Sequence, residues 1–300
     1  MSTALATIDL WSSVILPAID EALRRILPTK WGEYQFMRYA LLECLLLAPV
    51  CAAVGVKVVN FRMAFFSDAI SHSAFAGVAI GLLLHESFSA ADPRMTLVLF
   101  GLIVGLGIAY VRRTTDLSND TVIGVFFSAV VALGIAIVTR SGARTTQFQR
   151  YLYGDILNLD SADLGLSLLL GIAVLVFMIA GFNRLILVGL NDELAHSRGI
   201  RVRLYDYLFT LLLALVVTVS IRTAGILLVT ALLVIPAATA RNLARSAGGM
   251  FWWAIAFGLL SGVAGTLASF SDYLANVGTG AVIVLASVFF FIISALLRHK

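Results

Sequence analysis

Residues 37–59 read MRYALLECLLLAPVCAAVGVKVV, a mainly apolar run of the length that a helix needs to cross a lipid bilayer. Eight more runs of this kind follow, at about residues 65–85, 95–111, 121–139, 163–182, 205–221, 224–240, 250–270 and 279–297. The sixth and seventh are separated only by the short segment at residues 222–225, which leaves eight or nine complete crossings open. The sequence therefore predicts an all-α fold, a polytopic membrane bundle of eight to nine transmembrane helices.

The composition excludes an ordinary soluble domain. Of the 300 residues, 60% are hydrophobic and 13% are charged, and the mean hydropathy is +0.99. Soluble proteins carry about a quarter charged residues, so this chain has too few charges to cover the outside of a soluble fold. The net charge of +4 does not predict nucleic-acid binding, because the basic residues are scattered between apolar runs.

Basic residues in alternate loops predict the orientation of the chain, because cytoplasmic loops of membrane proteins are enriched in Arg and Lys. The loops after the odd-numbered runs hold Lys57, Arg62, Arg112, Arg113, Arg184, Arg198, Arg201, Arg203, Arg241, Arg245, Arg298 and Lys300. The loop at 140–162 departs from this rule, since it also holds arginines. We expect the C-terminus in the cytoplasm and, on nine crossings, the N-terminus outside.

Residues 1–36 differ from the rest, and we expect a leader there, ahead of a transmembrane permease domain at 37–300. A rough helical stripe, interrupted by Pro17, is formed by Leu10, Trp11, Val14, Ile15, Ile19, Leu23, Ile26 and Leu27. Charged residues at 20–21 and 24–25 lie opposite much of this stripe, which is typical of an amphipathic helix in the membrane interface. A partly disordered leader is the alternative.

Small residues predict how the helices pack. Glycines recur at a spacing of four residues in three pairs, Gly77 and Gly81, Gly101 and Gly105, and Gly258 and Gly262. Such pairs allow helices to approach closely in lipid. Cys44 and Cys51 would lie about 10 Å apart on one helix, too far for a disulfide, so we expect them to pack as small apolar residues.

Asp68 and His72 are the most informative charged residues, because ionisable groups within apolar runs are costly and therefore point to function. Their spacing of four residues stacks them on one helix face. A carboxylate and an imidazole on adjacent turns can both reach one divalent ion, and this ligand pair suits Mn²⁺, Fe²⁺ or Zn²⁺. The alternative is a capped helix start, in which Ser67 or Asp68 binds free amides and His72 pairs with Asp68.

Glu43 lies within the first run, as a third ligand or as a carboxylate in a polar contact between helices. No enzyme motif is present: the chain has no His-Glu-x-x-His, Cys-x-x-Cys or Gly-x-Ser-x-Gly sequence, and none of its three lysines follows a glycine-rich loop. We therefore expect a transport protein rather than an enzyme, driven by an ion gradient or by an ATPase on another chain.

Three stretches in register carry a resemblance to a known family. Residues 61–73 read FRMAFFSDAISHS and continue to GVAIG at 77–81; residues 151–157 read YLYGDIL; and residues 225–241 read GILLVTALLVIPAATAR. Together they resemble the permeases of zinc/manganese/iron ABC importers, and the resemblance covers about residues 37–297. The last external turn departs from the family pattern, since residues 275–280 read ANVGTG.

The resemblance implies the Type II ABC importer architecture, in the cytoplasmic (inner) membrane of a bacterium. It implies a pair of permeases, either two copies or two paralogues, with cytoplasmic ABC ATPase subunits and an extracytoplasmic metal-binding protein as partners. It also implies that Asp68 and His72 contact the transported metal, with no permanently bound cofactor. The choice among Zn²⁺, Mn²⁺ and Fe²⁺ stays open.

The resemblance also implies a coupling loop that docks on the ATPase, at residues 191–200. Its candidate contacts are Asp192, Glu193, Ala195 and Gly199. Gly199 is placed to end a short helix that begins near Asp192. Residues 241–245 are a candidate second contact, or a basic anchor at the membrane surface. Two alternative functions are a secondary metal/proton exchanger and a permease for a metal chelate such as a siderophore or cobalamin.

Overall fold

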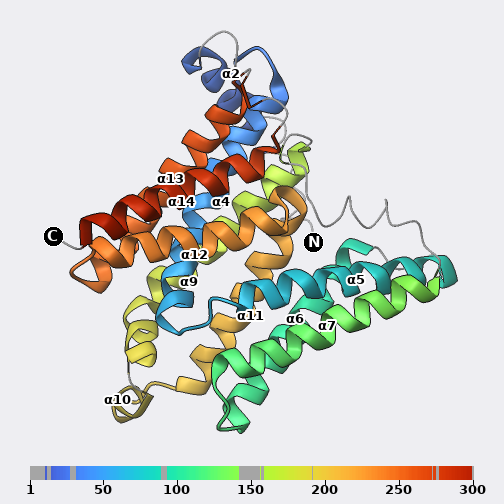
Figure 1. Cartoon of the computed structure of the whole chain (residues 1–300), viewed down its shortest axis with the longest axis vertical. Helices are drawn as coiled ribbons and strands as arrows, with labels where there is room; N and C mark the ends of the chain where they lie inside the picture. The colour runs from blue at the N-terminus through green and yellow to red at the C-terminus, as the bar shows by residue number, and fades with distance from the viewer. Residues whose placement is uncertain are drawn as a thin grey trace.

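The computed structural model describes residues 11, 15–27, 32–88, 93–141, 156, 159–190, 192–271, 273–274 and 277–298 (Figure 1). In these ranges the regular structure is helical, with no strand. The helices are α2 (Leu16–Ile26), α4 (Gln35–Asn60), α5 (Phe66–Phe88), α6 (Pro93–Thr114), α7 (Asn119–Ser141), α9 (Ser161–Leu190), α10 (Asp192–Ser197), α11 (Val202–Ala224), α12 (Ile226–Leu243), α13 (Ala247–Ser269) and α14 (Thr279–Arg298).

Nine of the helices in the described ranges are long and apolar enough to span a membrane, α4 to α7, α9 and α11 to α14. Each coincides with one of the predicted runs, so the all-helical prediction is confirmed. The break between the sixth and seventh spans is a single residue, Gly225, with φ +82°. A positive φ favours glycine, and it lets α11 end and α12 begin without a loop. Both helices are long enough to span, so nine candidate spans remain.

The spans form two groups joined by α11. In the first group, α4 packs against α9, α12 and α13, and α14 packs against α12 and α13; in the second, α5 packs against α6 and α7 (Figure 1). Helix α11 contacts α5 and α6 on one side and α9 and α12 on the other. It begins beside α10, which Figure 1 places at the lower edge of the bundle.

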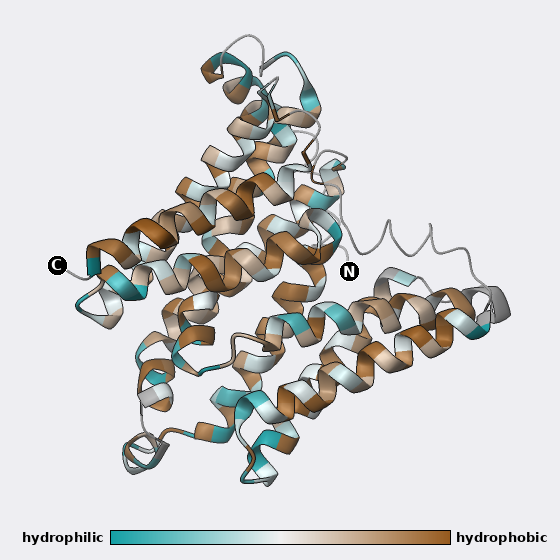
Figure 2. Cartoon of the chain, in the orientation of Figure 1, coloured by the Kyte–Doolittle hydropathy of each residue, from teal (hydrophilic) through white to brown (hydrophobic). Residues whose placement is uncertain are grey.

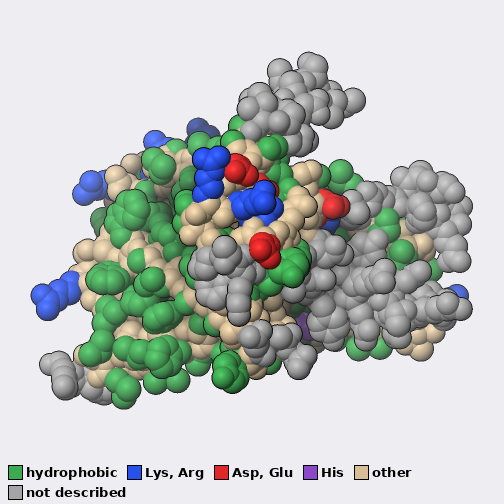
Figure 3. All heavy atoms as spheres, turned by 90° about the horizontal axis from the view of Figure 1, so that it is seen from above, with side chains coloured by type: hydrophobic (Ala, Val, Ile, Leu, Met, Phe, Trp, Pro, Cys, Tyr) green, Lys and Arg blue, Asp and Glu red, His purple; other side chains and the backbone are tan. Residues whose placement is uncertain are grey.

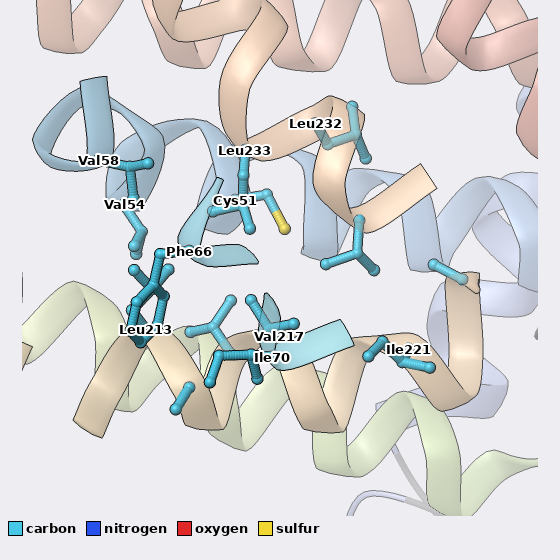
Figure 4. Close-up of a cluster of buried hydrophobic side chains, with 14 of the residues drawn as sticks. Cys51, Val54, Val58, Phe66, Ile70, Leu213, Val217, Ile221, Leu232 and Leu233 are labelled. Atoms are coloured by element: carbon cyan, nitrogen blue, oxygen red, sulfur yellow. The ribbon is translucent and has the colours of Figure 1, made fainter. Parts of the chain in front are cut away.

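The main apolar core fills the contact between α4, α5, α11 and α12 (Figure 4). Side chains labelled there are Cys51, Val54, Val58, Phe66, Ile70, Leu213, Val217, Ile221, Leu232 and Leu233, and each is at most 1% exposed. Cys51 lies in this core, and Cys44 is buried beside the hydroxyl of Thr266. Both cysteines are free, as predicted.

Small residues bring the backbones of α4, α12 and α13 together. A Cβ on Gly55 would lie 1.8 Å from the carbonyl oxygen of Leu233, and a Cβ on Gly258 would lie 2.9 Å from Cβ of Ala52. The three glycine pairs predicted from their spacing all face a neighbouring helix, since a Cβ on each member would contact atoms of that helix. The prediction of close helix packing at these pairs is confirmed, and Gly55 adds a contact that the spacing did not reveal.

The N-terminal segment packs on the bundle through a few contacts. Arg38 on α4 donates two hydrogen bonds to Asp20 on α2, at 2.6 and 2.8 Å. Trp11 and Leu16 are buried against Leu42 of α4 and Leu164 of α9. Pro17 lies in the first turn of α2, where proline is favoured, and Leu10 and Val14 of the predicted stripe lie outside the described residues. The interfacial position of residues 1–36 stays a prediction.

Polar and apolar surfaces are separated. Figure 2 shows the spans as mainly apolar along their length, with hydrophilic residues near helix ends and turns. Seen from the α2 end, Figure 3 shows basic and acidic side chains gathered near the centre and apolar side chains over much of the surrounding surface. At the other end, six basic residues of the predicted cytoplasmic set line one cavity, as described below. The orientation itself stays a prediction.

We expect Gly55→Ala to lower the free energy of unfolding in detergent by about 1–3 kcal/mol. The new methyl group would clash with the backbone of Leu233 and push α4 away from α12. Gly124→Ala is the matched control, since a Cβ there has open space within 4 Å. Thermal unfolding of the two purified variants measures the difference. Equal melting temperatures would contradict the assigned contact between α4 and α12.

Candidate functional site

Asp68 and His72 lie on the side of α5 that faces away from the main core. Successive helical residues are about 100° apart, so Asp68 is about 200° from Phe66 and His72 is about 200° from Ile70. Phe66 and Ile70 point into the core (Figure 4). Asp68 and His72 are only half-buried, and the ring of His72 packs edge-on against Phe127 of α7, with centroids 4.9 Å apart. The core thus positions the pair by fixing the rotation of α5.

Asp68 differs from the other carboxylates in the described spans. Asp163 pairs with Arg222 at 2.5 Å, and Asp206 is paired with two arginines. Glu43 accepts a hydrogen bond from Ser167, and Asp120 is exposed in the first turn of α7. Asp68 alone among them is partly buried with no hydrogen bond and no ion pair in the described part of the chain. Its oxygens are therefore available to a ligand.

The alternative interpretation, a capped helix start, does not fit the geometry of α5. The hydroxyl of Ser67 donates to the carbonyl oxygen of Ala64 at 3.1 Å instead of accepting from an amide. The carboxylate of Asp68 accepts no amide hydrogen bond, and it forms no ion pair with His72 within 4.0 Å among the described residues. Neither side chain caps the helix, and a carboxylate and an imidazole on adjacent turns are chemically able to coordinate a divalent ion.

Glu43 occupies a separate polar contact between α4 and α9. It is fully buried, and the hydroxyl of Ser167 donates to its Oε1 at 2.7 Å. Within the described residues, no three His, Cys, Asp or Glu side chains lie close enough together to hold a metal. Of the two interpretations left open for Glu43, the contact between helices is the one that the structure supports. Asp68 and His72 are therefore a pair of candidate ligands, and the described part of the chain places no third His, Cys, Asp or Glu beside them.

The predicted coupling segment contains a short helix, α10, between α9 and α11. Ala195 is fully buried on Val188 and Val202, while Glu193 and Leu194 are exposed. Gly199 follows the helix with φ +72°, and its amide donates to the carbonyl oxygen of His196 at 2.9 Å. Gly199 thus ends the helix as expected from the sequence. The side chain of Asp192 lies outside the described residues, as do residues 151–155 and 157 of the YLYGDIL stretch.

An ion cluster that the sequence analysis missed joins α6 to α11. The carboxylate of Asp206 accepts hydrogen bonds from Arg112 and from Arg113, the latter at 2.8 Å. Asp206 is 4% exposed, so the charges compensate one another away from water. In the sequence analysis both arginines served only to indicate the cytoplasmic side of the membrane. An acidic residue near the start of an apolar run was the signal that a partner was needed.

The cluster lies on the wall of a cavity of about 760 Å³ at this end of the bundle. The cavity is bordered by the last turns of α4, α6, α9 and α12 and the first turns of α11 and α13. Its charged lining comprises Lys57, Arg62, Arg112, Arg113, Asp206, Arg241 and Arg245. The cavity is therefore strongly basic, and it does not include Asp68 or His72.

Comparisons with known proteins agree with these features. The sequence pattern of the ABC 3 transport family matches residues 33–298. The manganese import system permease protein ScaB of Streptococcus parasanguinis is 32% identical over 268 residues, which are 89% of this chain and 92% of that protein. The high-affinity zinc uptake system membrane protein ZnuB of Haemophilus influenzae is 31% identical over 271 residues, which are 89% of this chain and 99% of that protein.

A solved structure is similar in fold as well. It is PsaBC from Streptococcus pneumoniae in complex with Fab, one chain of which matches with a TM-score of 0.74 at 30% identity. The match covers 89% of this chain and 93% of that chain. The resemblance inferred from the three sequence stretches is confirmed.

We expect Asp206→Ala to destabilise the protein strongly, by about 3–5 kcal/mol, because it leaves two arginines without a counter-charge at a buried position. Asp120→Ala removes an exposed carboxylate from the first turn of α7 and serves as the control, with an expected effect below about 0.5 kcal/mol. Thermal unfolding in detergent measures both. If the Asp206→Ala variant unfolded at the same temperature as the Asp120→Ala control, a structural role for the cluster would be contradicted.

Proposed function

The chain belongs to the ABC 3 transport family and is the membrane permease subunit of an ABC importer, and we propose that its cargo is a divalent transition-metal ion that contacts Asp68 and His72. The relatives are named for manganese import and zinc uptake, and a further relative at 28% identity is named as a probable iron transport system membrane protein. Their shared cargo is a divalent first-row metal, so the class of substrate is better supported than any single metal.

The observation that carries this proposal is the state of Asp68. Other carboxylates within the spans have a hydrogen-bond or ion-pair partner or lie exposed in a first turn, whereas Asp68 is half-buried and unpaired in the described chain. An unpaired carboxylate between apolar helices is costly, and a cation that visits it removes that cost. His72, one turn further along α5, adds a nitrogen ligand. Together they suit manganese, iron and zinc equally.

Two ligands per chain fit a site that is completed by a second permease. Transition metals in proteins take four or more ligands, and one chain supplies two within the described residues. Asp68 and His72 are half-exposed in the single chain, so they remain accessible at its surface. Two copies that bring these faces together would hold the ion with two carboxylates and two imidazoles. A paralogue that carries the same Asp and His pair could take the place of the second copy and complete the site.

Transport is driven by a separate ATPase in this proposal. The sequence has no P-loop, and α10 presents exposed Glu193 and Leu194 while buried Ala195 holds it to the bundle. A short helix fixed on one face and exposed on the other is suited to transmit movement of a docked ATPase. It leads directly into α11, which contacts the α5–α6 pair that carries Asp68. An extracytoplasmic binding protein would deliver the ion, at the cytoplasmic membrane of a bacterium.

The two alternative functions are not favoured. A metal/proton exchanger needs a relay of titratable side chains, but Glu43 is held by Ser167, and the described residues offer no cluster that joins it to Asp68. A carrier of a bulky chelate would recognise an organic surface, whereas the half-exposed groups at this site are a carboxylate and an imidazole.

We expect Asp68→Asn and His72→Gln each to reduce metal uptake by about tenfold or more in cells that depend on this importer, because each removes one ligand of the ion. Glu43→Gln is the matched control, since its amide oxygen can still accept from Ser167. Uptake of radioactive or isotopically enriched Mn²⁺ and Zn²⁺ measures the effect, with membrane levels of each variant as the check on folding. Wild-type uptake by both variants would remove the pair from the pathway.

We expect Gly199→Val to reduce the coupling of ATP hydrolysis to transport several-fold, because valine disfavours a φ of +72° and shifts the end of α10. Gly124→Val is the control, since that glycine has free space and an ordinary helical backbone. The measurement is ATPase activity of the reconstituted complex with and without the metal-loaded binding protein. Full stimulation in the Gly199→Val complex would contradict the assigned coupling segment.

A further inference from the structure

The basic cavity at the ends of α4, α6, α9, α11, α12 and α13 is not explained by metal transport. Its lining holds six basic side chains and one acidic side chain, Asp206, within about 760 Å³. Arg112 and Arg113 are both hydrogen-bonded to Asp206. Lys57, Arg62, Arg241 and Arg245 have no ion-pair partner in the described part of the chain. Such a cavity repels a divalent cation and attracts an anion.

Lys57 gives the strongest indication that this cavity binds an anion. It lies in the last turn of α4 and is 1% exposed, yet among the described residues no carboxylate neutralises it. Its ammonium group is 5.1 Å from the ring centroid of Phe182, and none of its three N–H donors has an oxygen acceptor among the described residues. A buried ammonium with no acceptor is costly, and its position on the cavity wall lets a bound anion supply the missing partner.

The N-terminus of α13 opens onto the same cavity. Ser246 and Ala247 line it, and the hydroxyl of Ser246 accepts from the amide of Gly249 at 3.1 Å. The amides of Ala247 and Gly248 have no acceptor in the described structure, and no acidic residue occupies the first turn. The start of a long helix carries partial positive charge and free N–H donors, which suit a phosphate group.

We propose that this cavity binds a phosphate-bearing anion, held by Lys57, Arg241, Arg245 and the amides at the start of α13. Arginine forks and a buried ammonium are well matched to phosphate oxygens. The headgroup of an anionic phospholipid and a soluble phosphate both offer this chemistry. The lipid has the further advantage that the cavity lies where the predicted cytoplasmic ends of six helices meet, at the level of the headgroups. An acidic side chain of the ATPase would be a different occupant.

The test uses the full-length permease, purified in a neutral detergent. Native mass spectrometry counts bound phosphatidylglycerol against phosphatidylcholine with the same acyl chains, and thermal unfolding is followed during titration with inorganic phosphate. We expect phosphatidylglycerol, inorganic phosphate or both to bind and raise the melting temperature. Binding of the lipid alone identifies the headgroup as the source, and binding of inorganic phosphate identifies a soluble anion; each result supports the site.

Two variants locate the binding. Arg241→Gln/Arg245→Gln removes two cavity arginines, and Lys57→Gln removes the buried cation; each should weaken anion binding by about tenfold or more. The control, Arg201→Gln/Arg203→Gln, removes two exposed arginines outside the cavity and should bind as the wild type does. The proposal is overturned if neither anion binds, or if both cavity variants bind like the control. It is also overturned if they retain anion binding and lose only ATPase stimulation, which would indicate a protein contact.

Discussion

The hydrocarbon core of a membrane offers a charged side chain no partner, and this constraint determines where charged residues occur in the spans and which helices they join. Within the described spans, Asp163 and Asp206 are paired with arginines, whereas Glu43 accepts a hydrogen bond from a hydroxyl at Oε1 and its buried Oε2 has no partner among the described residues. The ion pairs lie between helices distant in sequence, so they specify which helices are neighbours as well as satisfying charge. Asp68 is partly buried and has no hydrogen-bond or ion-pair partner among the described residues, and for this reason we propose it as part of the transport site.

The two groups of helices have different tasks. Close backbone contacts at Gly55 and Gly258 hold α4, α12 and α13 together, and they leave little freedom for relative movement. The α5–α7 group carries the proposed ligands. Helix α11 contacts both groups, begins after the proposed coupling segment, and is joined to α6 through Asp206. Movement that starts at α10 therefore has a direct physical route to the helix that bears Asp68.

Much of this arrangement could be predicted from the sequence, because bilayer thickness sets helix length and the cost of charge restricts where ionisable residues occur. All nine spans, the free cysteines, the packing role of the glycine pairs and the end of α10 at Gly199 followed from such local rules. Which helices meet could not be predicted, since apolar faces of similar composition pack equally well in many pairings. For that reason Asp206 went unnoticed, and basic residues that had served only to indicate orientation proved to line one cavity. Glu43 also needed the fold, because its partner Ser167 lies far along the chain.

The junction at Gly225 sets a limit on how the molecule can deform. One residue joins α11 to α12, and neighbouring Cα atoms stay about 3.8 Å apart whatever the backbone angles. The backbone angles at Gly225 can change, but the distance between the end of α11 and the start of α12 cannot increase. Any axial slide of α11 must carry the start of α12 with it, and free sliding of one helix past the other is forbidden. Relative movement of α11 and α12 at their junction is therefore restricted to tilting and turning about Gly225.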